Sequence, residues 1–170
     1  MIREKIDSLL DLLPDEELEH VYWSIISIKE NYDYNQKLLS KGISTDFLEE
    51  SSKSLLEKWD QTFATVSEQT KKEIYFDSFK WHLYSYEKLP HLSGEEAIQA
   101  FNQLPKKDIY FAYQRDMVKN QEFVQVFKNA QNMVASDIEH QQDLYLFDET
   151  FSWTYIQTHE DMCGPYFVQI

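Results

Sequence analysis

The spacing of apolar residues changes along this chain, from a helical repeat in the first half to strand-like alternation in the second. Up to about residue 76, apolar side chains recur every three or four residues, which is the period of an amphipathic helix. From Phe79 onward, several short segments alternate apolar and polar residues, as half-buried strands do. This order predicts helices first, followed by a sheet with further helices.

Pro14 divides the N-terminal segment into two expected helices. Residues 6–13 place Ile and Leu side chains on one helical face. A second, longer helix restarts after the proline, and three acids from Asp15 onward occupy its first turn, where the positive end of the helix dipole favours them. Gly42 indicates where it stops. Its apolar stripe consists of Leu18, Val21, Ile25, Ile28 and Tyr32.

The rest of the chain is predicted to form a mixture of helices and strands. A third helix runs through 55–63, and Ser67 caps a short fourth one. The helix at 93–104 begins with the capping-box pattern of Ser93 and Glu96. Another helix is expected at about 120–134. Strands are expected at 80–87 and 108–114, as a pair within 143–159 joined by a tight turn, and at 165–170.

These elements define the predicted fold class as α+β. We expect N-terminal helices followed by a mixed, partly antiparallel sheet of about five strands with helices packed on it. We divide the chain into an N-terminal helical segment, 1–41, and an α+β domain, 42–170. The order of the strands does not follow from the sequence.

The chain has one cysteine, Cys163, so an internal disulfide framework is excluded and no oxidising compartment is implied. The first ten residues lack an uninterrupted apolar stretch, and no run approaches the ~18 apolar residues that a membrane span requires. We therefore expect a cytoplasmic protein with no membrane partner.

The charge is strongly negative, with 30 acidic and 16 basic residues and a net charge of −14. Acids dominate residues 1–60 and 121–170, whereas 61–120 are balanced. Because phosphate backbones repel such a surface, we predict no nucleic-acid binding and favour a basic protein partner.

Four separated motifs of the chain, "WHLYSYEK", "SGEEAIQAFNQLPKK", "FSWTYIQTHE" and "CGPYF", resemble in order and spacing a small bacterial family, domain of unknown function 4275. The resemblance covers about residues 55–170. It implies a soluble bacterial protein and transfers no catalytic residue.

The segment "HEDMC" resembles a damaged HExxH zinc motif, because His159 and Cys163 stand four residues apart with Glu160 between them. In HExxH a helix brings both ligands to one face. Here the histidine ends an alternating strand pattern, and Gly164 and Pro165 follow the cysteine directly. We therefore predict no metal site and no helix in this loop.

Cys163 has two interpretations. It can be a catalytic thiol with His159 or His82 as its base, although Glu160 and its acidic neighbour would raise the thiol pKa. It can also be a small apolar residue in a tight turn, where Gly164 takes a positive φ. We favour the second interpretation. The first leaves open a small thiol- or metal-dependent enzyme centred on the His159–Cys163 loop.

The sequence contains neither a glycine-rich phosphate loop nor a GxSxG elbow, so no cofactor is predicted. The leading hypothesis is a non-enzymatic interaction module that binds a basic partner, as immunity proteins do by analogy. The apolar stripe of the N-terminal helices needs cover: it can pack on the α+β domain, or it can pair with its twin in a homodimer. The candidate partner-binding residues are Asp15, Glu16, Glu17, Glu19, Asp143, Asp148 and Glu149.

Overall fold

The computed structural model describes residues 1–48, 52–118 and 123–170. They form two compact units, Met1–Ser40 and Lys41–Ile170. None of the helices in these ranges combines the length and the apolar character that a bilayer-spanning segment needs.

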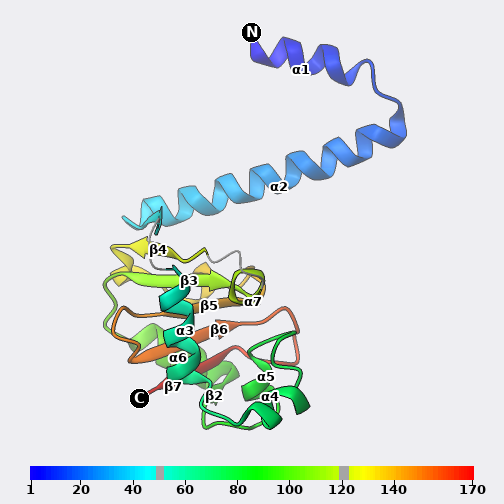
Figure 1. Cartoon of the computed structure of the whole chain (residues 1–170). Coiled ribbons are helices and arrows are strands. Elements are labelled where there is room, and N and C mark those ends of the chain that lie inside the picture. The colour runs from blue at the N-terminus through cyan, green and yellow to red at the C-terminus, as the bar shows by residue number, and fades with distance from the viewer. Residues whose placement is uncertain (49–51, 119–122) are drawn as a thin grey trace. The chain divides into compact units, whose positions relative to one another are not determined.

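The smaller unit contains the two expected helices, α1 (Ile2–Leu10) and α2 (Asp15–Ser40) (Figure 1). The carbonyl oxygen of Pro14 accepts the backbone N–H groups of Glu17 and Leu18 at 2.9 and 3.1 Å. Pro14 thus lies at the start of α2, immediately before the acids of its first turn.

The larger unit is built around an antiparallel sheet, which confirms the α+β class. Among the described residues the sheet has seven strands in the order β1-β4-β3-β5-β6-β7-β2, and each neighbouring pair is antiparallel. The strands are β1 (Ser44–Phe47), β2 (Leu92–Ser93), β3 (Ile109–Tyr113), β4 (Gln125–Lys128), β5 (Leu144–Phe147), β6 (Trp153–Gln157) and β7 (Tyr166–Gln169). The remaining helices are α3 (Ser52–Phe63), α4 (Glu68–Glu73), α5 (His82–Ser85), α6 (Gly94–Gln103), α7 (Gln114–Val118), and the 3-10 turns η1 (Ala130–Asn132) and η2 (Ala135–Asp137).

The sheet differs from the expectation of about five strands. Strands β3, β5, β6 and β7 were expected, whereas β1, β2 and β4 were not. The edge strands β1 and β2 are short and exposed, so they carry little of the apolar alternation that reveals a strand.

The predicted helix at 120–134 is wrong where the structure describes it. Residues 125–128 form β4, which lies between β1 and β3, and 120–122 lie outside the described residues. Val126 and Phe127 are both buried, on opposite faces of the sheet. Consecutive apolar residues of this kind fit a strand covered on both faces as well as they fit a helix.

The predicted strand at 80–87 is also wrong, because this segment forms the short helix α5. Leu83 and Tyr84, adjacent in sequence, are both buried, at 0% and 1% exposure. A strand would have pointed them to opposite faces, whereas the turn of α5 carries both into the core. The positive φ of Glu87, 54°, follows directly after this helical segment.

Both faces of the sheet are covered by helical segments. Trp59 of α3 packs on Tyr145 of β5, with ring centroids 5.4 Å apart, and α3 crosses in front of the sheet in Figure 1. On the opposite face, Phe101 of α6 packs on Trp153 and Tyr155 of β6 at 5.8 and 4.5 Å. The aromatic residues thus fill two cores, one on each side of the sheet.

Helix α6 starts at Gly94 as expected, but the predicted capping box is absent. The side chain of Ser93 makes no capping hydrogen bond. The other end of α6 is held instead, because the buried Nζ of Lys106 donates to the carbonyl oxygens of Phe101 and Leu104 at 2.6 and 3.2 Å. A cation at the C-terminal end of a helix also interacts favourably with the helix dipole.

A buried amide connects the segment before α5 to the sheet. The side-chain oxygen of Gln114 accepts the backbone N–H of Lys80 at 3.2 Å and the hydroxyl of Tyr145, and its NH2 donates to the carbonyl oxygen of Ser78 at 2.9 Å. The hydroxyl of Tyr145 accepts the backbone N–H of Trp81 at 3.1 Å. This network fixes Trp81 beside β5, close to Asp143.

The α3 side of the core also depends on one buried hydroxyl. Thr154 of β6 accepts a hydrogen bond from the indole N–H of Trp59 at 3.0 Å and donates to the carbonyl oxygen of Leu146 at 2.9 Å. Replacing Thr154 with valine keeps the shape but leaves the indole N–H buried without an acceptor.

We predict that Thr154→Val lowers the free energy of unfolding by about 1–3 kcal/mol, the typical cost of an unsatisfied buried polar group. Urea denaturation of the full chain measures it, with Thr65→Val at an exposed position as the control. Equal unfolding midpoints for the two variants would contradict this account of the core.

Candidate functional site

The pairing of β5 with β6 brings a carboxylate and a histidine together at one end of the hairpin. Leu144 faces Gln157 in this register, so Asp143, just before β5, lies close to His159, just after β6. Trp81, which is buried and immediately precedes α5, approaches the same point. The two ends of one hairpin thus meet a segment that is distant in the sequence.

The carboxylate of Asp143 holds His159 in one orientation. It lies 2.8 and 3.0 Å from Nδ1 of the ring, and it accepts the backbone N–H of His159 at 3.3 Å. The indole N–H of Trp81 donates to the same carboxylate at 3.0 Å. Because a carboxylate accepts hydrogen bonds, Nδ1 carries the proton and Nε2 is the nitrogen left for a ligand.

The surroundings of His159 combine aromatic rings and acids. Its ring centroid lies 4.9 Å from that of Phe79 and 5.8 Å from that of Trp81. Its Nε2 lies 3.8 Å from Oε1 of Glu160, and the side chain is 32% exposed. An imidazole held in this way can accept a proton or a hydrogen bond from a ligand that approaches from solvent.

His82 lies in the same aromatic group, but its ring is held by a different hydrogen bond. Nδ1 of His82 lies 2.7 Å from the carbonyl oxygen of Ile74, which anchors the ring. The His82 ring packs on Trp81 at 4.6 Å and on Phe79 at 5.5 Å. In the described residues, the hydrogen bonds of His82 and His159 go to Ile74 and Asp143, and neither ring is bonded to Cys163.

Cys163 lies in a turn rather than in a helix. Gly164 has the expected positive φ of 85°, and a Cβ there would lie 3.1 Å from the side chain of Thr158. The thiol is partly buried and packs against the main core. Burial raises the pKa of Cys163, the Glu160 carboxylate raises it further, and a hydrogen bond with Tyr166 acts in the opposite direction.

A polar hollow of about 320 Å³ lies on the loop side of this site. Its lining includes His140, His159, Glu160, Asp161 and Cys163. Although these residue types bind metals, no group of three or more such side chains in the described ranges is placed to hold an ion.

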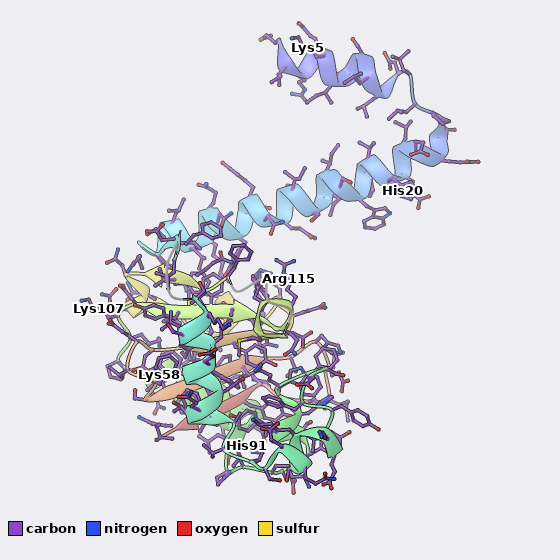
Figure 2. All side chains as sticks on the ribbon, in the orientation of Figure 1. Lys5, His20, Lys58, His91, Lys107 and Arg115 are labelled. Atoms are coloured by element: carbon purple, nitrogen blue, oxygen red, sulfur yellow. The ribbon has the colours of Figure 1, made fainter. Side chains whose placement is uncertain are left out.

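The remaining histidines lie elsewhere. His20 projects from α2, and His91 lies in the connection before β2 (Figure 2). Nδ1 of His91 lies 2.9 Å from the carbonyl oxygen of Leu89, and its ring packs on Tyr84 and Tyr166 at 5.5 and 5.2 Å.

The candidate partner-binding acids fall into two groups. On the β5–β6 hairpin, Asp143 holds His159, and Asp148 accepts the backbone N–H groups of Ser152 and Trp153 at 2.7 and 3.2 Å. Of the hairpin acids, Glu149 is the exposed one. On α2 the candidate acids, Asp15, Glu16, Glu17 and Glu19, are all exposed.

The sequence named His159 but not the groups that orient it. Asp143 was identified only as an acid available to a partner, and Trp81 was assigned to a strand. The alternating hairpin at 143–159 contained the missing signal, because its register places residue 143 opposite residue 158, next to His159.

The fold and the site together define an α+β protein with an aromatic-lined, carboxylate-oriented histidine at one end of its antiparallel sheet. The chain belongs to the family described as Domain of unknown function (DUF4275), whose model matches residues 32–167. The resemblance based on the motifs after residue 55 is therefore confirmed, and the match starts earlier, within α2. Searches of curated proteins and of solved structures each gave no match.

Asp148 gives the hairpin a pH-dependent contribution to stability. Burial acts to raise the pKa of Asp148, but the hydrogen bonds from Thr150, Ser152 and Trp153 outweigh it, and the pKa falls below its ordinary value. The charged form is therefore favoured in the folded chain. Its contribution is complete above the ordinary aspartate pKa of about 3.9 and disappears as the pH falls through the lowered value.

We predict that Asp148→Asn costs about 1–2 kcal/mol of stability at neutral pH, and that this difference from the native chain shrinks in acid. Chemical denaturation at several pH values measures the effect. Glu149→Gln, on the same turn but exposed, is the control. A penalty for Asp148→Asn that persists unchanged in acid would contradict the assignment.

The raised pKa of Cys163 predicts slow thiol chemistry. We expect the folded chain to react with iodoacetamide more slowly than free cysteine at neutral pH, and Glu160→Gln to speed the reaction. The pH profile of alkylation measures this, with Asp161→Asn as the control for a removed charge nearby. A thiol that reacts faster than free cysteine would support the enzyme interpretation instead.

Proposed function

We propose that this protein is a non-enzymatic interaction module that binds a basic protein partner through the acidic start of α2. The observation that supports the proposal is the exposure of four acids on α2, Asp15, Glu16, Glu17 and Glu19. All four are exposed, and no lysine or arginine in the described part of the chain lies within ion-pair distance of them. Their charge is available to a partner.

The sequence around these acids strengthens the field they produce. Residues 6–28 contain six acids and neither lysine nor arginine. An uncompensated negative segment of this kind speeds the encounter with a positively charged surface and disfavours acidic partners. Two aromatic residues of the same segment, Tyr22 and Trp23, are also exposed, at 56% and 60%. Aromatic residues of this type supply binding energy at interfaces once charge has brought the partners together.

On the hairpin, we expect Glu149 to contact the partner, and not Asp143 or Asp148. Asp143 and Asp148 already accept several hydrogen bonds from their own chain. Withdrawing either carboxylate toward a partner would leave those donors unsatisfied, at a cost of about 1–3 kcal/mol per buried group. We place the interaction in the cytoplasm, because the single cysteine provides no internal disulfide.

The alternative, a small enzyme centred on the His159–Cys163 loop, has one favourable feature. Asp143 orients His159 as a carboxylate orients the imidazole of a catalytic base. A thiol enzyme also needs an activated thiolate, and burial and Glu160 instead raise the pKa of Cys163. The hydrogen bonds of His159 lead away from the thiol. The interaction module is therefore the better supported proposal.

We predict that reversing Asp15, Glu16, Glu17 and Glu19 to lysine abolishes capture of the partner. The full chain is immobilised, and bound proteins are compared at low and high salt. Matched reversal of four other exposed acids, Glu68, Glu73, Glu95 and Glu96, serves as the control for net charge. Loss on reversal of the α2 acids but not of the control acids is the expected result.

The association rate of the captured protein then provides the decisive measurement. For a partner steered by charge, the rate falls with rising ionic strength, since the screening length shrinks to about 8 Å at physiological salt. A specific partner whose association rate ignores both salt and the α2 reversal removes the proposal.

A further inference from the structure

The apolar residues of α2 follow a seven-residue repeat. Leu18, Ile25, Tyr32 and Leu39 are spaced by seven, and Val21, Ile28 and Asn35 each follow three residues after one of them. These are the a and d positions of a heptad, which form the contact face of a coiled coil. α2 has 26 residues, so the repeat persists over about three heptads. We call this face the α2 seam.

The seam is exposed over most of its length. The side chains of Ile25, Ile28, Tyr32 and Leu39 are 49%, 68%, 62% and 55% exposed. Leu18 and Val21 are half-buried, so the exposed apolar part of the seam runs from Ile25 to Leu39. A helix of this pattern is stabilised mainly by whatever covers its apolar side chains. Isolated exposed apolar residues are ordinary, but a stripe in heptad register is typical of a helix with a helical partner.

We propose that the α2 seam pairs with the α2 seam of a second copy of this chain, and that the two helices run antiparallel. A second copy fits the seam because the a and d side chains of one copy can pack against those of the other. In an antiparallel pair, a positions meet d positions, so Ile25 meets Ile28 of the second copy, and Val21 meets its Tyr32. Leu18 meets Asn35 at the two ends of the paired region.

The distribution of charge selects the antiparallel direction. Residues 15–27 carry four acids and neither lysine nor arginine, whereas 28–40 carry two acids together with Lys29 and Lys37. A parallel pair would place the two acidic halves side by side, where like charges repel. An antiparallel pair places each acidic half beside the neutral half of its partner. The helix dipoles also oppose one another in this arrangement.

The positions beside the seam fit the same arrangement. In the antiparallel register Tyr22 lies next to Lys29 of the second copy, a pairing that allows a cation–π contact. Asp15 lies next to Gln36, so no two acids face each other at the positions that flank the seam. Glu16 and Glu19 point away from it and stay accessible to a basic partner. The dimer therefore goes beyond the proposed interaction function and does not depend on it.

The mass of the full chain in solution tests the pairing. We expect light scattering to give twice the mass of one chain, with a dimer that dissociates on dilution. Ile25→Glu with Ile28→Glu removes two seam positions, and it is expected to weaken the dimer at least about tenfold. Trp23→Glu with Ser27→Glu adds the same charge to the same stretch outside the seam, and it leaves the dimer in place. Circular dichroism checks that both variants keep their helices.

Thiol crosslinking tests the direction. Val21→Cys and Tyr32→Cys are made separately, each with Cys163→Ser so that no other thiol is present. Antiparallel pairing gives crosslinked dimers when the two variants are mixed, and far fewer with either alone. A parallel pair would crosslink each variant with itself and would overturn the proposal. So would a full chain that stays monomeric at every concentration, or seam and control variants that weaken the dimer equally.

Discussion

The complete burial of β5 is the constraint from which the rest of the larger unit follows. Leu144, Tyr145, Leu146 and Phe147 all have 0% exposure, although successive side chains of a strand point to opposite faces. An antiparallel sheet commonly leaves one face to water. Here both faces need cover, so α3 packs on one side and α6 on the other. The aromatic residues of the chain serve this double core, because large rings fill two layers with few residues.

The sequence was sufficient to predict those helices and strands whose apolar pattern fits only one type of secondary structure. The N-terminal helices, α6, and the strands from β5 to β7 all show a clear period bounded by proline, glycine or turn residues, and they were placed correctly. Errors arose where neighbouring buried residues satisfy two periods at once. Val126 and Phe127 face opposite cores, and Leu83 and Tyr84 share one. Both pairs look alike in sequence, and only the tertiary environment distinguishes a strand from a helical turn.

The site was predictable only in part, for a related reason. His159 and Cys163 were recognisable as residue types that carry chemistry, and the glycine after the cysteine indicated a turn. Asp143 lies across the β5–β6 hairpin from His159. Trp81 comes from a segment far away in the sequence, and the prediction for that segment, a strand, is wrong. A charged residue such as Asp143 gives no sign in the sequence of whether it faces solvent or three hydrogen-bond donors. That information lies in the register of the hairpin.

The family match begins at residue 32, in the middle of a continuous helix. The boundary of the family match therefore lies within one continuous run of helical backbone hydrogen bonds and not in a loop. Extending or shortening a helix by whole turns leaves its remaining turns intact. The turns of α2 before residue 32 can therefore vary in length or sequence while the helical hydrogen bonds after residue 32 stay the same.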